Sequence, residues 1–221
     1  EQNDVTIMVV EGEWDDIGSV LDTLGLTYDT VDGTVPGQAA SFLTNPTLMG
    51  TYDIIFFNCG IDDGWMTQQA AVTTNIQSYV AAGGSVYASD YAYWFVEASY
   101  PSQIDFFGDD TFFGEPMLGM EGYITANVVD PSMAAIVGPT AQLNMDLGYW
   151  VVMQSATATT LVSGTFDVED PLDWWNTLSV TGPLAVRFSV GQGDVLYTSF
   201  HNEQQSTFAM DRLLEDIVLS L

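Results

Sequence analysis

Three short apolar runs, each followed by a segment of helical periodicity, constrain the fold of this chain more than any other feature. The runs cover residues 5–10, 53–58 and 85–89. Continuous apolar runs of this length are typical of strands that are buried on both faces. The helical segments that follow them cover residues 17–24, 62–82 and 91–100. Strands that alternate with helices in this way predict a parallel sheet with helices on both of its faces.

The rest of the chain predicts further strands, a hairpin and a last helix. The strand-like segments of the irregular middle part cover residues 123–129, 150–153 and 159–166. An acidic, aromatic segment at 168–175 is predicted as a loop, residues 184–199 as a β-hairpin, and residues 204–220 as a helix that covers the sheet. No repeat or linker divides the sequence. We expect one α/β domain over residues 1–221, a three-layer, flavodoxin-like sandwich with a mostly parallel sheet, a C-terminal β-hairpin and an irregular insertion at about 101–182.

The charge of the chain is one-sided, with 30 acidic side chains against 2 basic ones and a net charge of −28. The basic residues are Arg187 and Arg212, so lysine is absent. Binding to nucleic acid or to an anionic membrane needs clustered lysine and arginine, so we expect neither partner. Catalysis by a lysine amine is excluded. Most carboxylates must be hydrated or bind cations, and calcium is the cofactor that this composition favours.

Cysteine content and hydropathy lead to an expectation about location. The single cysteine, Cys59, excludes an intramolecular disulfide. No apolar run reaches the roughly 20 residues of a transmembrane segment. We interpret the acidic, lysine-free surface, rich in hydroxyl and amide side chains, as that of an extracytoplasmic protein. It would be secreted or on the cell surface, with its signal peptide removed.

Chemically versatile residues follow three of the predicted strands. The only histidine, His201, lies in the segment Phe200-His201-Asn202-Glu203 after the last strand. Gly60 follows the run at 53–58, and Ser89-Asp90 ends the run at 85–89. Open α/β sheets place their sites at the carboxyl ends of strands. In this order the three segments resemble the class I glutamine amidotransferase-like superfamily, and the closing hairpin is similar to its trehalose-utilisation-like branch.

The resemblance implies a role for each of these residues and also contains a departure. In that superfamily a glycine supplies an oxyanion-hole amide, a sharp turn carries a cysteine nucleophile, and a histidine and a glutamate serve as the base and its orienting acid. The matching positions here are Gly60, Asp90, His201 and Glu203. Asp90 cannot form a thioester, and Cys59 lies on a different strand. The resemblance therefore implies the fold but not glutaminase activity, and we interpret Cys59 as a buried structural thiol.

Two classes of function fit these residues. The preferred one is a non-catalytic, extracytoplasmic binding or assembly domain that has lost the nucleophile. The alternative is a hydrolase of an amide, ester or glycan that uses Ser89 or Asp90 with His201 and Glu203, and Gly60 as the oxyanion donor. A third interpretation places zinc or manganese between Asp90, His201 and Glu203. A distance of about 3.2 Å or less from Ser89 or Asp90 to a His201 nitrogen would favour the enzyme.

Two further groups of residues are candidate binding sites. Glu11, Glu13, Asp15 and Asp16 follow the first strand and offer oxygen ligands for calcium, although they lack the spacing of an EF-hand. The aromatic residues exceed the needs of one core, and Trp174-Trp175 is the pair most expected at an interface. These features predict a protein partner, self-assembly or contact with a carbohydrate.

Overall fold

The structure of the chain, a computed structural model, describes residues 5–61, 66, 69–108, 116–202 and 207–221. The helices are α1 (Ile17–Thr23), α2 (Gln38–Leu43), α3 (Pro46–Met49), α4 (Ala70–Ala81), α5 (Tyr93–Ser99), α6 (Pro131–Val137) and α7 (Phe208–Ser220), with the 3-10 turn η2 (Asp90–Ala92). The strands are β1 (Ile7–Glu11), β2 (Asp29–Asp32), β3 (Ile54–Phe57), β4 (Ser85–Ser89), β5 (Ile104–Phe106), β6 (Met117–Gly119), β7 (Gly122–Val128), β8 (Thr140–Met145), β9 (Trp150–Val151), β10 (Met153–Ala156), β11 (Thr159–Asp170), β12 (Asp173–Val190) and β13 (Gly193–Thr198).

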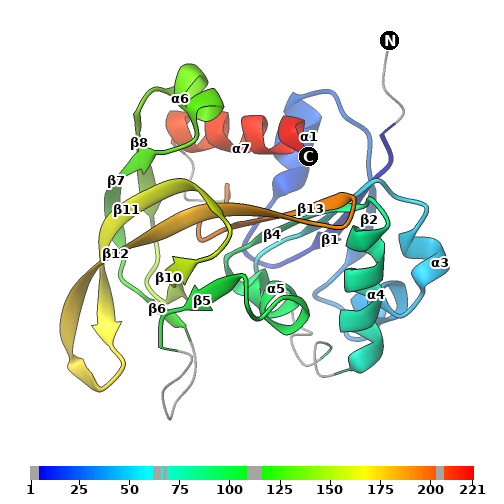
Figure 1. Ribbon diagram of the computed structural model, residues 1–221, viewed down its shortest axis with the longest axis horizontal. Coiled ribbons are helices and arrows are strands. Elements are labelled where there is room, and N and C mark those ends of the chain that lie inside the picture. The colour runs from blue at the N-terminus through cyan, green and yellow to red at the C-terminus, as the bar shows by residue number, and fades with distance from the viewer. Residues whose placement is uncertain (1–4, 62–65, 67–68, 109–115, 203–206) are drawn as a thin grey trace.

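Eleven strands of the described residues form one mixed sheet (Figure 1). Its first half is parallel, in the order β2-β1-β3-β4-β13. From β13 onward the pairings are antiparallel, through β12 and β11 to β6, β7, β8 and β9. The prediction of a mostly parallel sheet is therefore wrong. The segment between β4 and β13 adds strands joined by turns, and antiparallel pairing needs no crossover helix.

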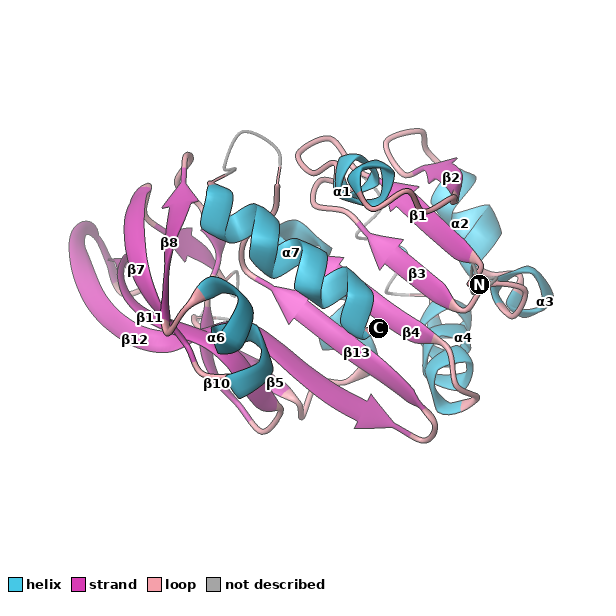
Figure 2. Ribbon diagram, turned by 90° about the horizontal axis from the view of Figure 1, so that it is seen from above, coloured by secondary structure: helices cyan, strands magenta, loops and turns pink. Residues whose placement is uncertain are grey.

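Two hydrophobic clusters form the core of the described residues. Alternate residues of β1 point into different clusters, with Ile7 and Val9 in the first and Met8 and Val10 in the second. This alternation is the period of a strand that is buried on both sides. The first cluster includes side chains of α1 and α7, and the second includes side chains of α2, α4 and α5. In Figure 2, α7 lies along β13.

The C-terminal hairpin is present and longer than its sequence pattern predicts. Ala185 pairs with Thr198 and Val190 pairs with Gly193, so the predicted hairpin at 184–199 is confirmed. The segment at 168–175 is not the loop that we predict, because β11 continues to Asp170 and β12 begins at Asp173. The β-branched and aromatic residues of this segment suit a twisted two-stranded ribbon. Its acidic residues suit a ribbon that is exposed to solvent.

Local capping explains where several helices begin. Asp16 caps α1 by accepting from the Ser19 amide, and Asp130 caps α6 by accepting from the amides of Ser132 and Met133. The helix expected at 62–82 begins at Ala70 in the structure; its expected capping residues, Asp62-Asp63, lie outside the described residues. No helix in the described part of the chain is long and apolar enough to cross a membrane.

Candidate functional site

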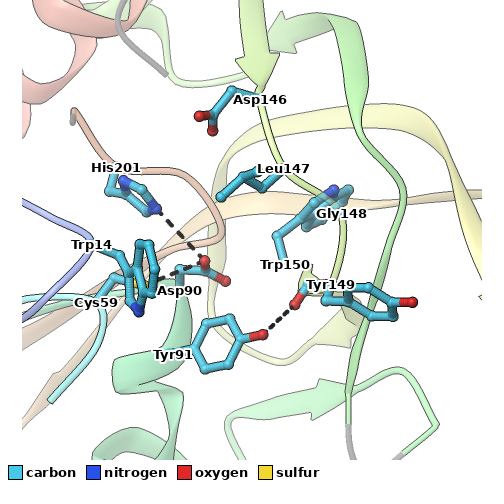
Figure 3. A pocket seen from close by; sticks show the side chains of 10 residues that line it. All are labelled: Trp14, Cys59, Asp90, Tyr91, Asp146, Leu147, Gly148, Tyr149, Trp150 and His201. Carbon is cyan, nitrogen blue, oxygen red and sulfur yellow. Dashed lines mark hydrogen bonds and ion pairs between the residues drawn. The ribbon is translucent and has the colours of Figure 1, made fainter. Parts of the chain in front are cut away.

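Three neighbouring strands end beside one another and bring Cys59, Asp90 and His201 together (Figure 3). Cys59 lies just beyond β3, Asp90 directly follows β4, and His201 lies just beyond β13. These strands are adjacent and parallel, so their carboxyl ends meet at one edge of the sheet. All three side chains are buried. One nitrogen, sulfur or oxygen atom of each lies within 4.8 Å of the others.

Asp90 occupies a sharp turn between β4 and η2. Its φ angle is 43°, a left-handed conformation that aspartate tolerates better than most residues. Its Oδ1 atom accepts a hydrogen bond of 2.7 Å from the Val151 amide. Its Oδ2 atom accepts a 3.5 Å contact from the Cys59 thiol and lies 3.7 Å from Nε2 of His201. One carboxylate oxygen is therefore held by the backbone, while the other faces the thiol and the imidazole.

Burial dominates the acid–base properties of this site. It raises the pKa of Asp90 to about 6, although the neighbouring His201 and the Val151 amide favour the ionised form. It also raises the pKa of the Cys59 thiol well above its usual range, and the negative charge of Asp90 adds to that effect. A thiol in this setting stays protonated at neutral pH unless a cation binds beside it.

Ser89 is fully buried and faces a second carboxylate, Asp15. Its hydroxyl donates to Asp15 Oδ2 at 2.5 Å and accepts from the Cys59 amide at 3.0 Å. Asp15 is itself buried, and its Oδ1 accepts from the Asn202 amide at 3.4 Å. These bonds join the ends of three strands to the loop after β1. The Ser89 hydroxyl thus bonds to buried groups and does not line the pocket.

The carboxylates of the acidic loop at 11–16 have different partners. Asp15 faces Ser89 as described, whereas Asp16 caps α1 and its backbone binds the Asn202 side chain. Glu11, Glu13, Asp15 and Asp16 line a surface groove with Asn58. Among the described residues, however, the group of histidine, cysteine or acidic side chains that lies close enough to share an ion is Cys59, Asp90 and His201. A calcium site on the loop stays a prediction.

A pocket of about 230 Å³ opens above the three buried side chains. Its lining residues are Trp14, Cys59, Asp90, Tyr91, Asp146, Leu147, Gly148, Tyr149, Trp150 and His201. Figure 3 shows Trp14 beside Cys59 and Asp90, with Leu147 pointing towards the same space from the segment before β9. The Tyr91 hydroxyl donates to the Tyr149 carbonyl at 3.0 Å, which ties the turn after β4 to that segment.

The remaining predicted site residues are Gly60 and Glu203. Gly60 has a φ angle of 87°, and its carbonyl accepts from the Glu13 amide at 3.2 Å. A Cβ atom there would lie 2.4 Å from Trp14 Cδ1, so only glycine lets the acidic loop pack against this turn. Its role as an oxyanion donor stays a prediction. Glu203 lies outside the described residues.

The distance expected of an enzyme is not met in this geometry. Oδ2 of Asp90 lies 3.7 Å from His201 Nε2, beyond the about 3.2 Å of a working hydrogen bond. Trp175 is 91% exposed near the β11–β12 turn, and its expected place at an interface stays a prediction. The side chain of Trp174 lies outside the description.

Two residues that shape this site were predicted in other roles, and one segment was not predicted to take part. Cys59 contributes its sulfur beside Asp90, Asp15 contributes a buried carboxylate, and the segment 146–150 forms one wall. Cys59 and Asp15 follow predicted strands, so their strand-end position could have marked them. The segment 146–150 comes from the irregular middle of the chain and carried no such signal.

No protein-family model matches the sequence, and no curated protein matches it. Solved structures do share the fold. A ThuA-like protein from Bacteroides uniformis is similar over 95% of this chain and 88% of its own, with a TM-score of 0.62 and 10% identity. Two proteins from Salmonella typhimurium cover 96% and 97% of this chain and 98% of their own, with TM-scores of 0.56 and 0.51 and identities of 12% and 13%. These likenesses show a shared fold and are consistent with a ThuA-like, amidotransferase-like one.

The comparisons also correct the expected location. Both Salmonella structures are described as cytoplasmic proteins, which contradicts the extracytoplasmic assignment. That assignment depended on the acidic, lysine-free composition alone. Surface charge governs solubility and association and does not determine the cellular compartment. Composition was therefore a poor guide to location.

Proposed function

We propose that this chain is a non-catalytic binding domain, and that its pocket binds a small neutral polyhydroxy compound such as a monosaccharide. We further propose that the chain is a distant member of the amidotransferase-like superfamily, with three-layer, flavodoxin-like packing in its parallel half. The observation that carries the binding proposal is the pocket itself. It sets the indole of Trp14 opposite Leu147, above a floor made by Asp90 and His201.

The lining of the pocket matches the two kinds of surface on a sugar. Trp14 is 47% exposed at the pocket, and such an indole face suits the apolar face of a pyranose ring. The carboxylate of Asp90 and the imidazole of His201 offer an acceptor and a donor for hydroxyl groups. A volume of about 230 Å³ lies below that of pockets for drug-sized ligands, so a small occupant is favoured.

Charge narrows the ligand class further. The pocket contains the carboxylates of Asp90 and Asp146, and the chain carries a net charge of −28. An anionic ligand such as a sugar phosphate would be repelled, and the described residues that line the pocket include no arginine or lysine to bind it. A neutral ligand is therefore favoured over an anionic one.

The non-catalytic assignment has its own support. A serine nucleophile would need its hydroxyl in the pocket and beside a base, but Ser89 is buried and donates to Asp15. An aspartate nucleophile would benefit from a close imidazole, but His201 Nε2 is 3.7 Å from Asp90. These positions favour binding over turnover.

Ligand titrations followed by tryptophan fluorescence and calorimetry test the proposal. A panel of neutral monosaccharides and cyclic polyols should include a compound that binds, and Trp14→Ala should weaken that binding at least about tenfold, or about 1.4 kcal/mol. Trp175→Ala is the matched control, because it removes an indole that is 91% exposed near the β11–β12 turn and should leave binding unchanged. Binding of quaternary ammonium compounds alone, or equal affinity in the Trp14 variant, would overturn the proposal.

A hydrolase is the second candidate, and the turn at Asp90 favours it. A non-glycine residue with a φ angle of 43° directly after a buried strand is the kind of local strain that gathers at functional sites. Asp90 would either attack the substrate as a nucleophile or activate a water molecule as a base, with His201 as its partner. Assays with aryl esters, amides and aryl glycosides should then show turnover that Asp90→Asn abolishes and Ser89→Ala retains. Absence of turnover in the wild-type chain removes this candidate.

A further inference from the structure

We infer that Cys59, Asp90 and His201 form a binding site for one divalent transition-metal ion, for which zinc is the best match. The sequence pattern suggested a different set, with Glu203 in place of the cysteine. The inference uses the floor of the pocket but does not depend on a sugar being the ligand. It rests on three separate properties of the group: the distances between its atoms, its charge and its access to the pocket.

The distances place the three residues close enough to share one ion. Zinc binds sulfur at about 2.3 Å, and nitrogen and oxygen at about 2.0–2.2 Å, at tetrahedral angles, so its ligand atoms lie about 3.3–3.6 Å apart. Asp90 Oδ2 lies 3.5 Å from Cys59 Sγ and 3.7 Å from His201 Nε2. The second separation is too long for a good hydrogen bond. The first separation matches an edge of a zinc coordination tetrahedron, the second is slightly longer, and the ligand atoms of all three residues lie within 4.8 Å of one another.

The surroundings hold Asp90 in the orientation that a metal ligand needs. The Val151 amide binds Oδ1 at 2.7 Å and leaves Oδ2 facing the thiol and the imidazole. The Tyr197 hydroxyl donates to the Asp90 carbonyl at 2.9 Å and fixes the turn from below. Such outer hydrogen bonds are what orient metal ligands in known sites.

The charge of the site calls for a cation. The carboxylate of Asp90 and the thiol of Cys59 lie beside the single imidazole, and a second buried carboxylate, Asp15, accepts from the neighbouring Ser89. The two arginines of the chain lie elsewhere, each paired with an acid, Arg187 with Asp194 and Arg212 with Glu215. A divalent ion would balance the charge of a thiolate and a carboxylate together. A ligand set that contains sulfur and imidazole selects zinc or its neighbours over calcium and magnesium.

The arrangement also leaves room for a fourth ligand. All three residues line the pocket, so the remaining coordination position would face the pocket. Zinc sites with three protein ligands and one open position bind water or an exogenous ligand there, whereas structural sites are closed by four protein ligands. The site would therefore offer an open, Lewis-acidic coordination position on the floor of an otherwise acidic pocket.

Titration of the metal-stripped chain with zinc, in competition with a chromophoric chelator, tests the inference. The buffer contains an excess of magnesium, which occupies ordinary surface carboxylates. We expect one zinc ion per chain, and loss of that binding in Cys59→Ser and in His201→Gln. Glu13→Gln is the matched control, since it removes an exposed acid from the neighbouring loop and should bind zinc like the wild type.

A spectroscopic measurement on the unaltered chain guards against variants that fail to fold. Cobalt bound by the same three residues should give a thiolate-to-metal absorption band and the intense visible bands of a four-coordinate ion. Absence of these bands, or zinc binding that magnesium abolishes, would overturn the inference. When the sugar titrations are made in the presence of a chelator, failure of the metal site and failure of sugar binding are separate results.

Discussion

At the scale of single residues, Asp90 is a buried carboxylate whose surroundings oppose its ionised form. Its folded-state pKa of about 6 exceeds the reference value of 3.8. A raised carboxyl pKa favours the protonated form in the fold, so stability is lost as pH rises from about 4 through about 6. In chain freed of metal, Asp90→Asn should be more stable than the wild type by about 1–3 kcal/mol at about pH 8. Asparagine also tolerates the left-handed turn.

Urea unfolding at about pH 5 and about pH 8 measures this difference. The gain should shrink at the lower pH, where the wild-type carboxyl is mostly protonated in the folded state. Asp90→Ala is the comparison variant, because it also removes the charge but loses the acceptor for the Val151 amide. It should be less stable than Asp90→Asn. A gain that is independent of pH would show that ionisation of Asp90 is not its source.

The site was only partly predictable because strand-end position identifies residues but not the directions of their side chains. Asp90 and His201 follow strands that turn out to be neighbours, so the prediction that they face one site is reasonable from sequence. Ser89 precedes Asp90 by one residue and therefore points to the other side of the strand end, into hydrogen bonds with Asp15. The approach of the Cys59 thiol depends on the pairing of β3 with β4, which sequence alone does not fix.

At the scale of elements, the β12–β13 hairpin contains one of the few ion pairs of the described residues. Arg187 binds Asp194 at 2.8 Å, and Ser189 donates to the same carboxylate. Burial alone would raise the pKa of Asp194, but the hydrogen bonds and the charge of Arg187 outweigh it and lower the pKa. A lowered carboxyl pKa stabilises the fold above the unfolded pKa of about 4, and that contribution is lost as pH falls through the folded value.

Asp194→Asn should therefore destabilise the chain at neutral pH, by about 0.5–1.5 kcal/mol. The difference from the wild type should narrow as pH falls below about 4. Denaturant unfolding across this range gives the measurement. Glu169→Gln on β11 serves as the control, since it removes one acidic charge outside this ion pair. If both variants respond alike, general charge rather than the Arg187 pair determines the stability of the hairpin.

Elements with a strong local period were predictable, whereas elements defined by their partners were not. The runs at 53–58 and 85–89 became β3 and β4 because a fully buried strand needs an unbroken apolar sequence. β8 (Thr140–Met145) alternates polar and apolar residues, which is the period of a half-buried strand, so its sequence did carry a local signal that the prediction missed. β12 runs for 18 residues across both halves of the sheet. Its length follows from having β13 and β11 as partners rather than from its own sequence.

At the scale of the whole molecule, one sheet joins two different halves. The parallel half places Cys59, Asp90 and His201 at its carboxyl edge. The antiparallel half supplies the other wall of the pocket through Leu147 and its neighbours before β9. The pocket therefore exists only where the chain leaves the βα pattern. This explains why βα periodicity could predict the floor of the site but not its walls.

The net charge of −28 affects the molecule as a whole rather than any single site. Acidic side chains that lack basic partners repel one another across the surface, and salt screens that repulsion beyond about 10 Å at 0.1 M ionic strength. The unfolding midpoint should therefore rise with sodium chloride concentration. Divalent cations should raise it further at equal ionic strength, because they associate with carboxylates more strongly.

Calcium compared with magnesium at equal concentration tests whether the acidic loop adds a specific site. Asp16 already caps α1 and Asp15 faces Ser89, so two of the four loop carboxylates are directed away from a common ion. We therefore expect calcium to raise the unfolding midpoint no more than magnesium does. A larger shift with calcium that disappears in Glu13→Gln would instead establish a loop site. It would also show that Asp15 or Asp16 can leave its present hydrogen bond to bind an ion, at the cost of the contacts that join the loop to β4 and α1.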